Sequence, residues 1–411
     1  MTLASMRWID GVVGRPLCFV LSLCFMLFGR WLWRVPAGRE RRVLFIELSE
    51  MGSTIVGSAA VQRVRAQHPA RPPCFVIFEK NAPSLRLLGL FAPTDVFTIR
   101  DDSLVSLAVD VVRFVGFCRA RGIDTTIDFE LFTRVSSILS LLSCAGTRVG
   151  FDNFLGEGLY RGDHLTHRVQ YNPYFHMSQN FLALVEALDE DPAAIPLVKR
   201  AIDVPAMTCR VPVERDAYEY VRDAIARQVD RPGRRLVLFN HDAGRLLPIR
   251  SWPVARYVEL ARLLLAWDPN VAVVLVGIPD AAASAREIVR GVDSPRCIEF
   301  VGRTRTLVDL VQLFHQADLL VTNDSGPAHF ASLTEIPCIT LFGPETARLY
   351  GPLGRNAVNI DKGFACSPCL TALNHRNSPC TDNRCLQAIS AAEVFEQAVR
   401  LLGTPVRASQ S

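Results

Sequence analysis

Short apolar runs alternate with longer amphipathic stretches along most of this sequence, from about Arg41 to about Gly403. The runs are rich in β-branched and aromatic residues, as strands buried in a parallel sheet are. The stretches between them repeat their apolar positions with the period of a helix, which predicts parallel sheets covered by helices. The runs that qualify as strands are RVLFIEL (42–48), CFVIFE (74–79), VFTI (96–99), DTTIDF (124–129), TRVGF (147–151), RLVLFN (235–240), VAVVLVG (271–277), CIEFV (297–301), DLLVTN (318–323) and CITLFG (338–343).

The pattern divides into two halves of the same kind. Helices are expected around 53–67, 81–91, 102–121, 131–145 and 390–403. A stretch with four prolines and weak periodicity, 189–216, is typical of a linker. We therefore predict an α/β protein with two Rossmann-like, doubly wound domains that face a cleft. The predicted parts are an N-terminal segment 1–40, a first domain 41–188, the linker, a second domain 217–403 and a tail 404–411.

The N-terminal segment has its own pattern. Between Arg15 and Arg30 lies an uncharged run of fourteen residues, PLCFVLSLCFMLFG. This run is shorter than the ~20 residues that span a bilayer, although Trp31 and Trp33 extend it. A basic cluster follows at Arg34, Arg39, Arg41 and Arg42. We expect a membrane-associated helix, either a span or an interfacial helix; a core helix and a cleaved signal are the other interpretations, and no small-x-small cleavage site follows the run.

Composition adds limits to this picture. The chain has 411 residues, of which 49% are hydrophobic and 21% are charged, so two domains with sizeable cores are expected and disorder is not. The formal net charge of +4 is too small to indicate nucleic-acid binding. Most of the 12 cysteines stand singly in apolar contexts, as reduced, buried thiols do. The exceptions are Cys366, Cys369, Cys380 and Cys385, whose spacing fits a structural zinc site, packed free thiols or disulfides.

The stretch VTNDSGPAHFA (321–331) is the clearest candidate for a ligand site. A buried strand ends there on a polar turn, and a short helix with a proline at its first position follows. We expect Asp324 or Ser325 to cap this helix, and Gly326 to let a ligand approach the backbone. His329 is either part of this site or a packed histidine. Such a turn suits a phosphate, because ligands of open parallel sheets bind at the carboxyl ends of the strands.

Other loops that follow strands carry weaker signals. Arg250, just before a predicted helix, suits a diphosphate, although a solvated arginine explains it as well; Arg245 lies in the same loop. Asp280 in GIPD (277–280) and Thr304 in VGRTRTL (301–307) could help to hold a purine or a ribose. The loop SEMGS (49–53) is either a plain turn or a ligand site. The acidic triplet 189–191 lies in the proline-rich linker and is rejected as a metal site.

The block FVGRTRTLVDLVQLFHQADLLVTNDSGPAHFASLTEIPCITLFGP (300–344), together with IRSWPVARYVEL (249–260), resembles glycosyltransferase family 9, the heptosyltransferases of lipopolysaccharide core assembly. The resemblance implies two lobes of the glycosyltransferase B type and no catalytic metal or other cofactor. It also implies a C-terminal lobe that binds a nucleotide sugar such as ADP-heptose through Asp324, Gly326, His329 and Arg250, and an N-terminal lobe that holds the acceptor. We expect Ser325, Asp280 and Thr304 to belong to the same donor site.

One position departs from the family. Its opening loop normally ends in Gly-Asp, and that aspartate is the candidate base; here the pair is Gly52-Ser53. A serine cannot act as a carboxylate base, so Glu50 in the same loop is our candidate, with Glu47 as the alternative. A surface role for Glu50 explains its presence equally well.

Together these observations predict a metal-independent, inverting glycosyltransferase at the cytoplasmic face of the inner membrane, with a lipid-linked saccharide as acceptor and no nucleic-acid partner. The alternative is a non-catalytic sugar-nucleotide-binding relative in which Ser53 marks a lost reaction. A nucleotide-sugar epimerase is disfavoured because the G-x-G-x-x-G fingerprint of dinucleotide binding is missing.

Overall fold

The structure is a computed structural model that describes residues 10–32, 41–131, 133–154, 156, 158–204, 209–229, 235–244, 247–374 and 376–404. The chain forms two compact units. The first comprises Met1–Pro205 together with the short segment Ala372–Arg376, and the second comprises Ala206–Thr371 and Asn377–Ser411. The division falls within the proline-rich stretch 189–216.

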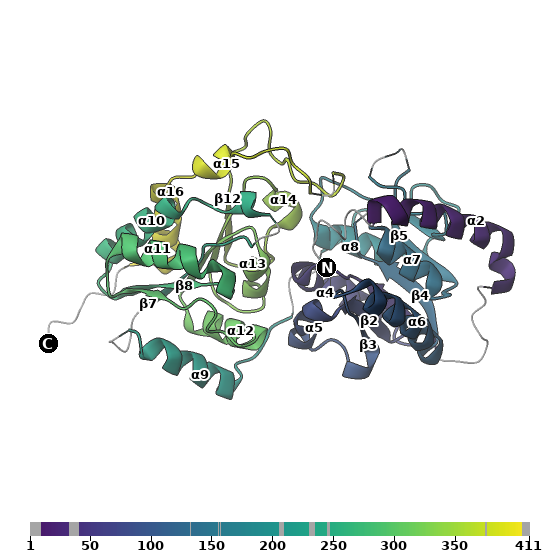
Figure 1. Cartoon of the computed structure of the whole chain (residues 1–411), viewed down its shortest axis with the longest axis horizontal. Helices are drawn as coiled ribbons and strands as arrows, with labels where there is room; N and C mark the ends of the chain where they lie inside the picture. Colours follow the sequence, from purple (N-terminus) through teal and green to yellow (C-terminus); the bar gives the residue numbers. More distant parts are fainter. Residues whose placement is uncertain are drawn as a thin grey trace. The chain divides into compact units, whose positions relative to one another are not determined.

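The first unit contains a six-stranded sheet in which every strand pair is parallel, in the order β3-β2-β1-β4-β5-β6 (Figure 1). This is the strand order of a doubly wound Rossmann fold. Its strands are β1 (Arg42–Ile46), β2 (Pro73–Phe78), β3 (Val96–Ile99), β4 (Ile123–Asp128), β5 (Thr147–Asp152) and β6 (His167–Gln170). Its α-helices are α2 (Arg15–Leu32), α3 (Met51–Val56), α4 (Ser58–Gln67), α5 (Ala82–Leu88), α6 (Leu104–Arg121), α7 (Arg134–Leu142) and α8 (Met177–Glu186).

The second unit repeats this plan, with a parallel sheet in the order β12-β11-β10-β7-β8-β9. Its strands are β7 (Arg235–Asn240), β8 (Val271–Val276), β9 (Cys297–Glu299), β10 (Leu319–Asn323), β11 (Cys338–Leu341) and β12 (Ala357–Ile360). Its helices are α9 (Arg215–Ala226), α10 (Val254–Trp267), α11 (Ala282–Val292), α12 (Leu307–Gln316), α13 (Gly326–Ala331), α14 (Ala347–Tyr350), α15 (Arg384–Gln387) and α16 (Ala391–Leu402).

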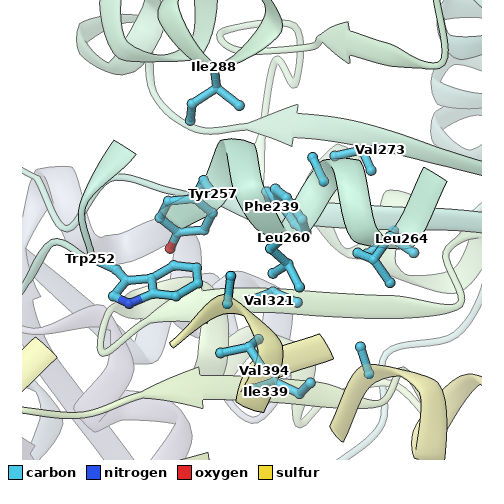
Figure 2. Close-up of a cluster of buried hydrophobic side chains, with 14 of the residues drawn as sticks. Phe239, Trp252, Tyr257, Leu260, Leu264, Val273, Ile288, Val321, Ile339 and Val394 are labelled. Atoms are coloured by element: carbon cyan, nitrogen blue, oxygen red, sulfur yellow. The ribbon is translucent and has the colours of Figure 1, made fainter. Parts of the chain in front are cut away.

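A large core of the second unit lies between its sheet and helices α10, α11 and α16. Phe239 of β7 packs near Tyr257 of α10, and Trp252 lies edge-on to the same tyrosine ring, with centroids 4.9 Å apart (Figure 2). All three side chains are fully buried. Trp252 also donates from Nε1 to the carbonyl of Ile389, 3.0 Å away, so the core anchors the loop that leads into α10.

The structure confirms the predicted fold class and every predicted strand, but each sheet has a sixth strand that the apolar pattern did not indicate. Both missed strands, β6 and β12, lie at a sheet edge. β6 alternates buried and exposed residues, and β12 has one buried residue. A continuous apolar run marks a strand covered on both faces, and an edge strand need not carry one.

The apolar N-terminal run forms most of α2, which follows a short π-helical turn, Asp10–Gly14. Residues Asp10–Leu27 are long and apolar enough to cross a membrane by length and composition alone. Trp33, Arg34 and Arg39 of the predicted flank, Arg245 and the tail after Thr404 lie outside the described residues, as does the side chain of Trp31.

Candidate functional site

The carboxyl ends of the strands in the second unit carry a buried group of one arginine and two carboxyls. Asp324 follows β10, Glu345 follows β11, and Arg250 closes a 3₁₀ turn, Pro248–Arg250, before α10. Arg250 Nη1 lies 3.2 Å from Asp324 Oδ2. Asp324 and Glu345 are both buried, so this one guanidinium lies close to two carboxyls that have little access to water.

The charges in this group shift each other's pKa. Burial raises the pKa of Asp324, and the guanidinium of Arg250 opposes that shift. Burial, with a smaller contribution from the charge of Asp324, raises the pKa of Glu345 to about 8, and Arg250 again opposes it. Glu345 is therefore mostly protonated at neutral pH, while Asp324 is the ion-pair partner of Arg250. The Nε atom of Arg250 is buried and has no hydrogen-bond partner among the described residues.

Two side-chain amides, one of them buried, hold the Arg250 loop in place. The side-chain oxygen of Asn323, at the end of β10, accepts from the Trp252 backbone N–H (2.9 Å) and from the Tyr257 hydroxyl (3.2 Å). The side-chain amide of Asn383 donates to the carbonyls of Ile249 and Ser251, both at 2.8 Å. These contacts fix the backbone on both sides of Arg250. Sequence reasoning missed Glu345, Asn323 and Asn383; the only sequence signal for Glu345 and Asn323 is a polar residue at or just after the end of a buried strand.

The turn after β10 differs from the prediction in one respect. Ser325 occupies the N-cap position of α13, but no side chain caps this helix, so the expected cap by Asp324 or Ser325 is wrong. The Asp324 carboxylate binds Arg250, which offers it a charged partner. The Ser325 hydroxyl accepts instead from the side-chain amide of Asn240 at 3.0 Å. The helix starts at Gly326, so Pro327 is its second residue, and the half-buried His329 lies three residues after Gly326.

Asp280 and Thr304 lie farther along the same edge of this sheet. Asp280 is exposed in the 3₁₀ turn that follows β8, and Thr304 is half-buried in the loop that follows β9. The two loops touch, because the Gly302 N–H donates to the Gly277 carbonyl at 2.9 Å. Gly302 has a φ of +69°, which favours glycine. Asp280 and Thr304 thus lie beyond the carboxyl ends of β8 and β9. Arg250 and Asp324 lie beyond those of β7 and β10, the next strands in the sheet.

In the first unit, Glu50 immediately precedes α3, and its carboxylate has two partners. Ser53 donates from its hydroxyl to Glu50 Oε2 at 3.1 Å, and Arg376 forms an ion pair with Glu50 Oε1. Arg376 comes from the segment Ala372–Arg376, which belongs to this unit although it follows the second sheet in sequence. The Glu50 side chain is 39% exposed, so water and a small ligand can reach it.

Three further carboxyl groups lie buried at the ends of β1 and β4. Burial raises the pKa of Glu47 well above its usual range, and the nearby Glu130 and Asp128 add to the shift. Burial also raises the pKa of Asp128 to about 6, although Arg161 pairs with it. Glu130 accepts hydrogen bonds from the backbone N–H groups of Leu48 and Ser49, both at 2.9 Å. Sequence reasoning missed Asp128, Glu130, Arg161 and Arg376.

These environments distinguish the two glutamates proposed as a base. Glu47 is buried and its pKa is raised, which disfavours the carboxylate form that a general base needs. Glu50 is accessible and paired with a cation. Of the two, Glu50 has the environment that a general base needs.

The cysteine cluster does not form a metal site in the described part of the chain. All twelve cysteines are free thiols, with Cys366 exposed, Cys385 buried, and Cys369 and Cys380 in between. No group of three or more His, Cys, Asp or Glu residues among the described residues is arranged to hold a metal ion.

Comparison with known proteins gives a consistent result. The family model of glycosyltransferase family 9 (heptosyltransferase) matches residues 119–378, which is more than half of the chain. Lipooligosaccharide heptosyltransferase 2 of Haemophilus influenzae is 26% identical over 196 residues, which cover 47% of this chain and 54% of that protein. Lipopolysaccharide heptosyltransferase 2 of Escherichia coli K12 is 32% identical over 113 residues, 27% of this chain and 32% of that protein. The matched stretches thus span about half or less of these curated relatives.

Solved structures agree on the fold. The E. coli ADP-heptose lipopolysaccharide heptosyltransferase II has a TM-score of 0.64 at 18% identity, covering 88% of this chain and 98% of that chain. The family 9 glycosyltransferase of Veillonella parvula has a TM-score of 0.67 at 18% identity, covering 88% and 97%. At this level of identity the likeness shows a shared fold.

Proposed function

This chain belongs to glycosyltransferase family 9, and from that membership and its strand-end chemistry we propose that it transfers a sugar, heptose, from a nucleotide-diphosphate sugar such as ADP-heptose to a saccharide acceptor. The acceptor in this proposal is the lipopolysaccharide core or another lipid-linked saccharide. The second unit binds the donor and the first unit binds the acceptor.

The observation that carries the donor assignment is the Arg250 group. A glycosyl transfer releases a nucleoside diphosphate, whose negative charge grows as the bond to the sugar breaks. A fixed guanidinium with a free Nε donor can stabilise that charge. Asp324 holds the guanidinium in place through Nη1. With this cation supplied by the chain, we propose that the transfer needs no metal.

The acceptor side of the proposal rests on Glu50. Its carboxylate takes the proton of the acceptor hydroxyl while that oxygen attacks the anomeric carbon from the face opposite the leaving diphosphate, so the configuration inverts. Ser53 donates to Glu50 Oε2 and thereby orients the carboxylate. In this proposal Ser53, at the position where the family has its aspartate, orients the carboxylate of Glu50, three residues earlier in the chain.

A non-catalytic relative is the second candidate, because Ser53 itself cannot act as a base. The purified full chain should first be tested for thermal stabilisation by a panel of nucleotide sugars, because a ligand that binds the native state raises its melting temperature. The stabilising donor is then incubated with and without acceptor saccharide. We expect nucleoside diphosphate to be released only when acceptor is present. Adding a chelator should not stop this release. Stabilisation without acceptor-dependent release would favour the non-catalytic candidate.

We further propose that the protein acts at the cytoplasmic face of the inner membrane. A lipid-linked acceptor resides there, and the apolar segment that includes α2 would keep the enzyme near it. The segment could do so as a single span or as a helix that lies on the surface.

A further inference from the structure

The contacts that α2 makes with the rest of the first unit indicate whether it spans a membrane or lies on its surface. Cys18 and Ser22 are buried and lie four residues apart on one face of α2, and Gly14, at the end of the preceding π-helical turn, is buried as well. The Ser22 hydroxyl accepts from the backbone N–H of Asp163 at 2.9 Å. Cys18 is fully buried. The helix is therefore packed against the first unit along this face.

Charged residues of the first unit also touch this helix and the turn before it. The carboxylate of Asp10 accepts from the Arg134 backbone N–H at 2.9 Å and pairs with the Arg134 guanidinium at 3.1 Å. The guanidinium of Arg148 lies 4.6 Å from the centre of the Phe25 ring. A helix that crossed the bilayer in this arrangement would bring Arg134 and Arg148 into hydrocarbon, where charged groups are costly. The docked geometry thus favours a helix that lies parallel to the membrane surface.

The opposite face of α2 is apolar and exposed. Phe19, Val20, Leu23, Met26 and Leu27 are 61%, 51%, 45%, 74% and 64% exposed, respectively. With 3.6 residues per turn, Val20, Leu23 and Leu27 lie on the side of the helix opposite Cys18 and Ser22, and Phe19 and Met26 lie on its flanks. An exposed apolar strip of this length on a docked helix indicates a partner surface.

A second apolar strip lies on the same side of the first sheet. Thr126 of β4 pairs with Arg148 of β5 in register, so both side chains point to one face. Thr126 bonds to Ser140 of α7 at 2.7 Å, and Arg148 contacts Phe25 of α2, which places both helices on that face. Helix α6 packs with α7 in one apolar cluster there. On α6, Leu104, Val105, Val109 and Val112 are exposed, at 56%, 74%, 46% and 73%.

The exposed charges on these two helices are of one sign. No Asp or Glu occurs between Gly11 and Arg39, and the one acidic residue within α6, Asp110, is buried and paired with Arg100. Arg15, Arg113 and Arg119 are exposed. A surface with apolar strips and arginines, and without exposed acids on either helix, complements anionic lipid head groups.

We propose that α2 and α6 together form a membrane-docking face that lies on one leaflet of an anionic bilayer, with α2 parallel to the surface and not across it. This inference rests on the proposed membrane location but not on the proposed reaction. The apolar side chains enter the boundary between head groups and acyl chains, and the arginines contact lipid phosphates. The catalytic residues of the first unit take no part in it.

The test is flotation of the full-length protein with vesicles of phosphatidylglycerol and phosphatidylcholine in equal parts, and with phosphatidylcholine alone. We expect binding to the mixed vesicles to exceed binding to phosphatidylcholine by about tenfold. The double variant F19E/M26E should reduce binding to the mixed vesicles by about tenfold. The matched control is I195E/V213E, because Ile195 and Val213 are 62% and 57% exposed and lie outside both helices; it should bind like the wild type.

Topology and activity separate the remaining outcomes. In intact spheroplasts, a tag before residue 1 should resist added protease, whereas a spanning α2 would expose it and overturn the proposal. Equal flotation of F19E/M26E and wild type would also overturn the proposal. If F19E/M26E lost a dimer that the wild type forms and still bound vesicles equally, the apolar face would be an interface between two copies of the chain. The turnover of F19E/M26E on a soluble acceptor should equal that of the wild type. If neither protein turns over while flotation behaves as expected, the proposed reaction fails and the docking face stands.

Discussion

The two units share one strand order but differ in the chemistry at their strand ends. In the first unit, four carboxyl groups gather after β1 and β4, and most are buried: Glu47, Glu50, Asp128 and Glu130. In the second unit, a single arginine lies close to two buried carboxyls, Asp324 and Glu345. The same topology thus presents an acid-rich edge in one unit and an anchored cation in the other.

This difference shows what the fold does and does not determine. A doubly wound sheet brings the loops after its strands to one edge, whatever their sequence. The side chains in those loops decide whether the edge can take up a proton or hold an anion. Within the acid-rich edge, burial raises the pKa of Glu47, while Glu50 is partly exposed and paired with Arg376. Neighbouring carboxyls in such different environments can take different roles in acid-base chemistry.

The largest expected effect comes from removing the cation of the second unit. Arg250→Met leaves Asp324 buried without its partner, which should lower the free energy of unfolding by ~3–5 kcal/mol. Nucleotide-sugar binding should also be lost. Urea unfolding and calorimetric titration measure the two effects.

A double variant separates these effects. R250M/D324N no longer buries a charge at position 324, so it should regain part of the stability but none of the binding. Arg256→Met is the matched control, because Arg256 is 38% exposed in a surface pair with Glu259 and should change stability by less than ~0.5 kcal/mol. Nucleotide binding by R250M/D324N would show that the arginine does not hold the donor.

The second prediction concerns the acid-rich edge. Glu50→Gln keeps the shape of the side chain and removes its ability to take up a proton. We expect kcat to fall by about 10²–10⁴-fold while the affinity for the nucleotide sugar is unchanged. Steady-state kinetics and calorimetry test both parts. Glu47→Gln should keep most of the activity, since burial disfavours the carboxylate form of Glu47. A larger loss in E47Q than in E50Q would reverse the assignment.

The third prediction uses the pH dependence of stability. Glu345 has its pKa raised from the usual 4.5 to about 8. An acid with a raised pKa in the folded state stabilises the fold fully below 4.5, and this contribution is lost as the pH rises toward 8. Between these values the wild type should lose up to ~1.4 kcal/mol per pH unit from this group. Glu345→Gln should remove that slope in urea unfolding at several pH values, and an unchanged slope would assign the titration to another group.

The sequence predicted the elements of both units better than it predicted their sites. Buried strands carry continuous apolar runs, so ten of the strands were visible, whereas the edge strands β6 and β12 were not. Arg250 and Asp324 were predicted individually, but their pairing joins residues far apart in sequence. The same holds for Arg376 and Glu50. A side chain's partner across a sheet edge depends on tertiary structure, and no local pattern encodes it.

The smallest expected effect on kcat comes from changing Ser53. This residue tests which carboxylate of the acid-rich edge in the first unit acts as the base. Ser53→Ala removes the hydroxyl that donates to Glu50 Oε2, and a hydrogen bond of this kind contributes about 1 kcal/mol, so kcat should fall about fivefold. Ser53→Asp in the E50Q background returns a carboxylate to the place where the family has one. Because the chain already places Ser53 within hydrogen-bonding distance of Glu50, we expect E50Q/S53D to be faster than E50Q alone. Equal rates for E50Q/S53D and E50Q would mean that a carboxylate at position 53 does not reach the acceptor hydroxyl. The role of Ser53 would then be limited to orienting the Glu50 carboxylate.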